Sequence, residues 1–558
     1  MVTRLPPAHG ITLILLLAVA TGVRAQIRFE DIAARSGVKF ELRNGAAGEF
    51  HQPELMLGGV AVLDYNNDGC MDIFFTNGAA MPSLKKSGPQ YSNRLFRNNC
   101  DGTFTDVTEK AGVSGEGYSM GVAVADYDND GYPDIFVTGV NRNILYHNRG
   151  DGTFENLTEK AHLGGVDPHY GKLWSVSAAW VDVDNDGWLD LVITNYVQWD
   201  PQLEPRCGSP TNPSYCHPDA YHDTPNQLFR NNHDGTFTDI TESSGLGTHL
   251  GKGMGLAIAD YDDDGLMDIF VANDSVPNFL FHNLGHGKFE EIGLLAGVAL
   301  NDDGRPVAGM GVDFRDFDND GRPDLIFTAM INDTYPLFRN TGRSPAFEDD
   351  TARAGLAVPT RALTGWGIGL YDFDNDGFKD LLTTNSHFPA LDRLLGMQPA
   401  LPNSLFRNQG DGRFEDVSKS SGADFQLAGQ YRGVAFADFD NDGRLDAVIA
   451  NVNGPARLFH NVTPNAGHWL AVKLIGTRSN RDGIGAKIAL TLPSGRRLYN
   501  HCSTSVGYAS SSEPLVRFGL GKEALAKLIQ IHWPSGQVQE LRDVKADHVL
   551  RVSEPQAN

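Results

Sequence analysis

The stretch Asp126-Tyr127-Asp128-Asn129-Asp130-Gly131-Tyr132-Pro133-Asp134 decides the fold of this chain. The same nine-residue pattern occurs seven times, always with Asp at positions one, five and nine and Gly at position six. The copies begin at Asp64, Asp126, Asp182, Asp260, Asp316, Asp372 and Asp438, between 56 and 78 residues apart. Recurrence at a near-constant interval indicates an array of one structural unit.

Each copy has the same neighbours in the sequence. A Gly-containing apolar run such as Met120–Ala125 precedes it, and apolar residues such as Ile135–Val137 follow it. Short runs without alternation are typical of strands buried on both faces. Next come a Leu-aromatic-basic-Asn motif, usually an Asp-Gly turn typical of hairpins, and a segment that opens with Phe. Each unit is therefore predicted to hold four antiparallel strands, as in a propeller blade.

The number of units predicts how the array ends. Seven acidic loops are followed by only six Phe segments, which open at Phe104, Phe154, Phe237, Phe289, Phe347 and Phe414. The missing one is found near the N-terminus, where Phe29-Glu30-Asp31-Ile32 matches Phe414–Val417. We therefore expect a closed ring, which removes a free sheet edge, and not a row of separate modules. The predicted fold is all-β: a seven-bladed β-propeller with calcium loops, followed by a small C-terminal β-sandwich-like domain.

The acidic loops are predicted to bind metal, because carboxylates packed within nine residues repel one another unless a cation lies between them. Oxygen donors without His or Cys select a hard ion, and calcium accepts six to eight oxygens. An EF-hand is excluded because position twelve holds Phe75, Val137 and their equivalents where a bidentate Glu is required. About seven Ca²⁺ ions are expected, and their simplest role is to stabilise the blades.

The predicted metal ligands occupy positions one, three, five and nine of each loop. They are Asp64, Asn66, Asp68 and Asp72; Asp126, Asp128, Asp130 and Asp134; Asp182, Asp184, Asp186 and Asp190; Asp260, Asp262, Asp264 and Asp268; Asp316, Asp318, Asp320 and Asp324; Asp372, Asp374, Asp376 and Asp380; and Asp438, Asp440, Asp442 and Asp446.

The first 25 residues are interpreted as a signal peptide. Arg4 precedes the apolar run Ile11–Val23, and Val23-Arg24-Ala25 resembles a cleavage site. An uncleaved membrane anchor is the alternative, although the run is short for a bilayer span. We expect a secreted protein, extracellular or periplasmic, with a propeller at residues 26–465, a β-domain at 466–558 and no transmembrane segment after signal removal.

Charge and cysteine content limit the possible partners and compartment. The net charge of -24 argues against nucleic acid, whose phosphates would be repelled. Cys207 and Cys216 lie in one Pro-rich stretch and can pair in an oxidising compartment. Cys70 and Cys100 are a second possible pair, which leaves Cys502 as a buried thiol.

Taken together, these motifs resemble the FG-GAP repeats of integrin α chains. The whole chain resembles the cartilage acidic protein family and its bacterial relatives, which join such a propeller to an ASPIC/UnbV domain. That domain is suggested by the stretches Asn480–Ala486, Gly507-Tyr508, Phe518–Gly521 and Trp533–Gly536. The resemblance implies an extracellular calcium-binding protein with a matrix or adhesion role.

A partner, either a protein or a glycan, is expected on the face without calcium. The long insertions 77–92, 195–225 and 385–402 all fall between the second and third strands of a unit. The middle one carries Trp199, Tyr215 and Tyr221, which could grip a sugar or a peptide, or else pack the loop over the propeller mouth. His217, Asp219, His222 and Asp223 offer a weaker transition-metal hypothesis.

Catalysis is the alternative function, as a carbohydrate-active enzyme or an oxidoreductase acting at the axial mouth; an assembly scaffold is a third hypothesis. The chain has no H-E-x-x-H or phosphate-binding Gly motif, and no catalytic residue is predicted. Arg149-Gly150-Asp151 spells an integrin-recognition tripeptide, but Arg149 occupies a variable position of a repeated turn.

Overall fold

The computed structural model of the protein describes residues 25–344, 346–389, 391 and 396–556. The predicted signal peptide lies outside these residues except for Ala25. Among the helices of the described residues, none combines the length and the apolar character that a membrane span requires.

Seven four-stranded antiparallel sheets make up most of the molecule, as the repeats predict. From the innermost strand outward, the sheets consist of β2 (Val60–Leu63), β3 (Asp72–Phe75), β4 (Arg94–Asn98) and β5 (Phe104–Asp106); β6 (Tyr118–Ala125), β7 (Asp134–Val140), β8 (Ile144–Asn148) and β9 (Phe154–Asn156); β12 (Ser175–Val181), β13 (Asp190–Asn195), β17 (Gln227–Asn231) and β18 (Phe237–Asp239); β20 (Gly253–Ala259), β21 (Asp268–Asn273), β22 (Phe279–Asn283) and β23 (Phe289–Glu291); β24 (Gly309–Arg315), β25 (Asp324–Ala329), β26 (Leu337–Asn340) and β27 (Phe347–Asp349); β28 (Gly365–Tyr371), β29 (Asp380–Asn385), β30 (Ser404–Asn408) and β31 (Phe414–Asp416); and β32 (Tyr431–Ala437), β33 (Asp446–Asn451), β34 (Arg457–Asn461) and β1 (Phe29–Asp31).

The innermost strands follow one another in a cycle. Each lies beside the innermost strand of the next sheet, and β32 of the seventh sheet lies beside β2 of the first. The approach is close enough to require glycine at defined positions. A Cβ on Gly255 would lie 2.0 Å from the carbonyl oxygen of Met310, and one on Gly311 would lie 2.0 Å from that of Trp366. The all-β chain is therefore arranged in the manner of a propeller.

The outer strand of the seventh sheet comes from the N-terminus. β1 pairs antiparallel with β34, with Phe29 opposite Asn461. The Phe29 side chain is 1% exposed and packs against the rings of Phe373, Phe425 and Phe459. A strand of three residues thus pairs with one that lies more than four hundred residues later in the chain.

Short helices follow several outer strands and were not predicted from the sequence. Thr108 shows why one begins there, because its N–H and its hydroxyl both donate to Asp106 at the end of β5. Gly112 then ends the helix at φ 78°. The α-helices are α1 (Ala33–Ser36), α2 (Thr108–Ala111), α3 (Thr158–Ala161), α4 (Thr241–Ser244), α5 (Gly293–Ala296) and α6 (Ala357–Thr360), and the 3₁₀ turns are η1 (Gln52–Leu55), η2 (Pro89–Tyr91), η3 (Pro218–Ala220), η4 (Leu246–Thr248), η5 (Ser418–Ser420) and η6 (Asp424–Gln426).

The C-terminal strands form two further sheets that pack face to face. Their order is β38-β35-β41 in one sheet and β37-β36-β39-β40 in the other. Leu470, Val472, Leu490 and Ile529 are buried in the core between them. The strands are β35 (His468–Ile475), β36 (Lys487–Thr491), β37 (Arg497–His501), β38 (Val516–Gly521), β39 (Leu525–His532), β40 (Val538–Lys545) and β41 (His548–Ser553).

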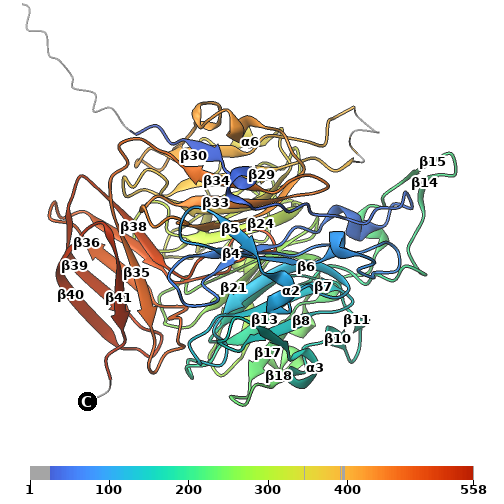
Figure 1. Ribbon diagram of the computed structural model, residues 1–558, viewed down its shortest axis with the longest axis horizontal. Helices are drawn as coiled ribbons and strands as arrows, with labels where there is room; N and C mark the ends of the chain where they lie inside the picture. The colour runs from blue at the N-terminus through green and yellow to red at the C-terminus, as the bar shows by residue number, and fades with distance from the viewer. Residues whose placement is uncertain (1–24, 345, 390, 392–395, 557–558) are drawn as a thin grey trace, which may run out of the picture.

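The C-terminal sheets and the longest insertion project on opposite sides of the ring (Figure 1). The insertion between β13 and β17 carries the ribbon of β14 (Cys207–Ser209) and β15 (Asn212–Ser214), which extends away from the C-terminal sheets. Two smaller ribbons pair β10 (Val166–Asp167) with β11 (Gly171–Lys172) and β16 (Thr224–Pro225) with β19 (Leu250–Gly251).

Candidate metal centre

The seven acidic loops, numbered one to seven in chain order, share one backbone geometry. In loop two the Asp126 carboxylate accepts the N–H of Asp130 at 3.0 Å and the N–H of Gly131 at 2.7 Å. The first Asp of every other loop accepts the equivalent pair of N–H groups. Gly131 has φ 94°, a left-handed conformation that glycine adopts without strain and that turns the chain back on itself.

The ninth position ties each loop to its sheet. Asp134 accepts the N–H of Tyr127 within the loop and the N–H of Asn148 at the end of β8, at 3.3 and 2.8 Å. The same two bonds recur at the last Asp of the other loops. Five peptide N–H groups per loop, counting the one that donates to position five, therefore hold three carboxylates in place.

The third position points its oxygens at the same place but has few partners of its own. In loop two, ligand oxygens of Asp126, Asp128 and Asp134 lie within 4.8 Å of one another. Buried Oδ1 atoms of Asp128, Asp184 and Asp374 lack a hydrogen-bond partner, and Asp374 is only 1% exposed. A buried acceptor without a donor is costly, so a cation among these oxygens fits the donor set.

Burial and like charge raise the pKa values of several loop carboxyls. Loss of hydration raises the pKa of Asp72 to about 8, and Asp64 and Asp68 add to the shift. Burial likewise raises the pKa of Asp182 to about 7 and that of Asp438 to about 7. A cation beside these carboxyls would offset both causes, because it favours their charged form.

Side chains from the third strands also reach the loops, although they were not among the predicted site residues. His147, His282 and His460 each place Nδ1 3.1–3.2 Å from an oxygen of the ninth-position Asp. In loop six, Arg407 instead pairs with Asp374 and Asp376. The signal was the basic position of the Leu-aromatic-basic-Asn motif, which we interpreted only as strand sequence.

Asparagine at position four links one loop to the next around the ring. Asn67 donates to the carbonyl of Gly131, and Asn441 of loop seven donates to that of Gly69 in loop one. Loops two, three, five and six make the same bond. Loop four differs because Asp263 stands at this position and pairs with Lys487 of the C-terminal domain.

The C-terminal sheets lie against the acidic loops. The N–H of Asp126 donates to Asp482 at 2.9 Å, and Arg517 lies 3.4 Å from Asp438. Lys487 pairs with Asp260 at 2.8 Å. A cleft of about 1410 Å³ remains between loops four and five and these sheets. The β-domain is therefore docked on the side of the acidic loops, which the sequence did not reveal.

The predicted Cys207–Cys216 disulfide is present in the structure, and the possible second pair, Cys70 and Cys100, is also a disulfide. Cys207 is joined to Cys216 at the base of the β14–β15 ribbon, and Cys70 of loop one is joined to Cys100. Cys502 is a buried free thiol.

The aromatic residues proposed for partner binding pack against the ring. Trp199 is 4% exposed and Tyr221 is 8% exposed, and both donate to the carboxylate of Glu204. His51 bonds the same carboxylate, and Tyr215 donates to Glu54 at 2.8 Å. The structure thus favours the alternative interpretation, in which these aromatic side chains hold the insertion over the mouth of the propeller, because their surfaces already contact other parts of the chain.

The other sequence hypotheses place their residues in ordinary surroundings. Asp223 pairs with Lys252 at 2.9 Å, and His217 lies 3.3 Å from Asp219, so the transition-metal hypothesis gains no support. In the integrin-type tripeptide, Arg149 pairs with Glu155 and Asp151 accepts the hydroxyl of Thr153, as the equivalent turns do.

Comparison with protein families matches two models to the chain. The FG-GAP-like repeat matches residues 64–137, 127–193, 220–271, 260–327, 316–383 and 391–449, and the ASPIC and UnbV model matches residues 476–558.

Similar proteins include cartilage acidic protein 1 from Mus musculus, which is 25% identical over 520 residues, covering 89% of this chain and 74% of the mouse protein. The Homo sapiens protein of that name is 29% identical over 310 residues, covering 54% of this chain and 43% of its own length.

Solved structures give weaker matches. An Agrocybe aegerita lectin that recognises non-reducing terminal N-acetylglucosamine has a TM-score of 0.41 and 18% identity, covering 72% of this chain and 87% of the lectin. Rhamnogalacturonan lyase from Bacillus licheniformis has a TM-score of 0.35 and 13% identity, covering 78% of this chain and 75% of the lyase. Both likenesses are too distant to bear on function.

Proposed function

Because the chain belongs to the cartilage acidic protein-like family of FG-GAP repeats joined to an ASPIC/UnbV domain, we propose that it is a secreted calcium-binding propeller that acts as an extracellular binding or adhesion module. The seven sheets are then the blades of one closed ring spanning residues 26–465, and residues 466–558 form the C-terminal domain. The cyclic order of the innermost strands and the pairing of β1 with β34 support this architecture.

The observation that carries the calcium proposal is the repetition of one carboxylate cage in seven loops. Each cage is fixed by the same peptide N–H groups, and buried oxygens at position three lack donors in loops two, three and six. Calcium, when bound, supplies the positive charge and the flexible oxygen coordination that such a cage lacks. The folded protein holds the ligand oxygens together before the ion binds. The free energy needed to bring these carboxylates together is therefore supplied by folding.

Metal analysis of the dialysed protein tests this proposal. We expect about seven Ca²⁺ per chain, and about one fewer in the Asp184→Ala variant, because this change removes the position-three oxygen from loop three, whereas Asn66 keeps an oxygen at that position in loop one. Asp234→Ala is the matched control, since Asp234 is an acid of an exposed Asp-Gly turn in the same sheet. Equal calcium content in both variants, or a wild type with no calcium after dialysis, would refute the loop assignment.

Secretion is supported by the two disulfides, which persist in oxidising compartments, together with the signal-like residues 1–25. The expected location is extracellular or periplasmic. Mass spectrometry of the mature N-terminus tests this, with a chain that begins near Gln26 as the expected result and an intact Met1 as the contrary one.

The partner, a protein or a glycan, is proposed to bind the face that carries the insertions. Trp199 and Tyr221 are buried there, so contact falls to exposed residues such as Leu203, which is 82% exposed, and to the β14–β15 ribbon. Deleting residues 200–220 would also remove Glu204 and its bonds to His51 and Trp199. Replacing only the tip, residues 209–212, by Gly and Ser is therefore the cleaner test. Loss of captured partner with an unchanged melting temperature supports this face, and full retention argues against it.

A further inference from the structure

The C-terminal domain sends a segment into the axis of the ring. Residues 502–515, here called the axial segment, connect β37 to β38 and are buried from Cys502 to Glu513. The segment folds back on itself, because the N–H of Ser512 donates to the carbonyl of Thr504 at 2.9 Å. It consists mainly of small residues, Ser503-Thr504-Ser505-Val506-Gly507-Tyr508-Ala509-Ser510-Ser511-Ser512.

The axial segment hydrogen-bonds the inner strands as an added strand would. Ser511 exchanges backbone bonds with β2, accepting from Val62 at 3.0 Å and donating to Val60 at 3.1 Å. Gly507 exchanges backbone bonds with Val312 of β24, at 2.8 and 3.1 Å. These inner edges carry peptide groups that otherwise need water, and an inserted peptide can satisfy them.

The contacts extend to every sheet of the ring. The remaining partners, one sheet at a time, are Val122 of β6 with the carbonyl of Ala509, Ser177 of β12 with the N–H of Ala509, Leu256 of β20 with the hydroxyl of Ser505, Trp366 of β28 with the ring of Tyr508, and Phe436 of β32 with Ser512 and Glu513. Contact with all seven sheets is possible only from the axis.

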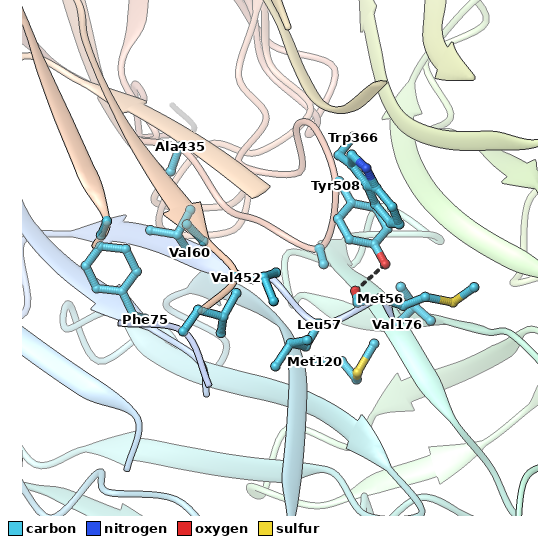
Figure 2. Close-up of a cluster of buried hydrophobic side chains, with 14 of the residues drawn as sticks. Met56, Leu57, Val60, Phe75, Met120, Val176, Trp366, Ala435, Val452 and Tyr508 are labelled. Carbon is cyan, nitrogen blue, oxygen red and sulfur yellow. Dashed lines mark hydrogen bonds between the residues drawn. The ribbon is translucent and has the colours of Figure 1, made fainter. Parts of the chain in front are cut away.

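Tyr508 carries the segment across to the far mouth. Its side chain is fully buried, and its hydroxyl donates to the carbonyl of Met56 at 2.5 Å (Figure 2). The neighbouring carbonyl of Leu55 accepts two bonds from Arg432, whose guanidinium stacks 3.8 Å from the Trp366 ring. Figure 2 shows Tyr508 and Trp366 beside Met56, Met120 and Val176. The axis is thus filled from one mouth to the other.

We propose that the axial channel is a peptide-binding site whose occupant is the chain's own axial segment. The C-terminal domain then fills the channel and blocks it to other ligands. The segment fits because it is rich in Gly, Ala and Ser, which allow backbone approach, and because Tyr508 anchors its tip. The inference does not depend on calcium. It also assigns the C-terminal domain a role and directs external partners away from the axis.

A nicked full-length protein provides the test. A protease site is inserted between Pro464 and Asn465, which are both exposed, and the chain is cut after folding. In the described part of the chain no disulfide joins the two domains, so only noncovalent contacts hold them together after cutting. The wild-type fragments are expected to co-elute in size-exclusion chromatography, both in calcium and in EDTA.

Gly507→Val should separate the nicked fragments at least tenfold faster than wild type. A Cβ at Gly507 would lie 3.0 Å from the carbonyl oxygen of Ile368 on an inner strand. Gly495→Val is the matched control, because Gly495 has φ 89° against 84° for Gly507 but lies in an open turn of the same domain. Tyr508→Ala adds no atom and should show the same direction if Gly507→Val fails to fold.

Two outcomes would overturn the proposal. One is a wild-type nicked protein that falls apart on elution. The other is an equal rate of separation for Gly507→Val and Gly495→Val, since docking would then rest on rim contacts such as those of Lys487, Arg517 and Asp482. The rates at which the fragments separate are compared at one calcium concentration and again in EDTA. If the loops bind no calcium, the comparison between the two variants is unaffected, so failure of this proposal and failure of the calcium proposal are distinguishable.

Discussion

At the scale of single residues, the protein places charged groups where water cannot reach them and compensates for each in a specific way. The loop carboxylates receive peptide N–H groups and, under the proposed function, calcium. Arg432 is compensated by carbonyl oxygens and the Trp366 ring, and burial lowers its pKa to about 9. His501, the last residue of β37, is buried and avoids the cost of a buried charge by remaining neutral.

His501 makes the folded state sensitive to acid. Burial, and then the charges of Arg315, Lys379 and Lys487, lower its pKa to about 3. Below about pH 6.5 the unfolded chain takes up a proton that the folded chain refuses, so the free energy of unfolding falls by up to about 1.4 kcal/mol per pH unit. In saturating calcium, the melting temperature should therefore fall less steeply between pH 6.5 and pH 4.5 for His501→Gln than for the wild-type protein. Parallel slopes would contradict this assignment.

At the scale of elements, short strands hold the ring through side chains as much as through backbone bonds. β1 has only three residues, yet it supplies the outer edge of the seventh sheet. Its stability comes mainly from Phe29, which is enclosed by three aromatic rings. Truncating that side chain should loosen the closure of the ring.

Phe29→Ala should destabilise the fold by about 3–5 kcal/mol, the usual range for removing a buried Phe. Glu30→Ala is the control, because Glu30 alternates to the exposed side of the same strand and makes only a surface ion pair with Arg35. Urea denaturation followed by tryptophan fluorescence measures both variants. A shift for Phe29→Ala no larger than that for Glu30→Ala would mean that β1 does not close the ring.

At the scale of the whole molecule, calcium and protons should compete for the same carboxylates. The chain carries a net charge of -24, and several loop carboxyls hold raised pKa values without metal. Each ion present at a hundredfold excess over its Kd adds about 2.7 kcal/mol to folding. The melting temperature at pH 8 should therefore drop in EDTA and recover when calcium is added. An unchanged melting temperature in EDTA would contradict the proposal that the loops bind calcium.

The sign of the pH effect reverses when the metal is removed. In EDTA the folded state holds protons, on Asp72 up to about pH 8, that the unfolded chain releases near pH 4. Stability in EDTA is therefore expected to rise as pH falls from about 8 to about 5. With calcium present, the stabilisation by metal should shrink over the same range, because protons displace the ion. Melting temperatures measured at pH 8 and pH 5.5, in EDTA and in calcium, give the change of stability with pH under each condition.

The sequence by itself determined the repeating unit, because every repeat carries its own turn and strand signals. Asp126 to Asp134 specify one loop through contacts between near neighbours, and Phe29 identifies the missing outer strand by its match to Phe414. The pairing of Cys207 with Cys216 is equally local, since nine residues separate them. Short-range chemistry of this kind can be inferred without coordinates.

Only the tertiary structure decided what occupies the axis. Ser511 meets Val60, and Tyr508 meets Met56, across more than four hundred residues of sequence, so no local pattern records these contacts. In the sequence, Gly507-Tyr508 indicated only that a C-terminal domain follows the propeller. The sequence could not show that Trp199 and Tyr221 are buried, because their burial depends on Glu204 and on the distant chain around His51. They were therefore proposed to bind a partner. Sequence specifies the units, whereas the closed ring creates an interior that the units do not possess singly.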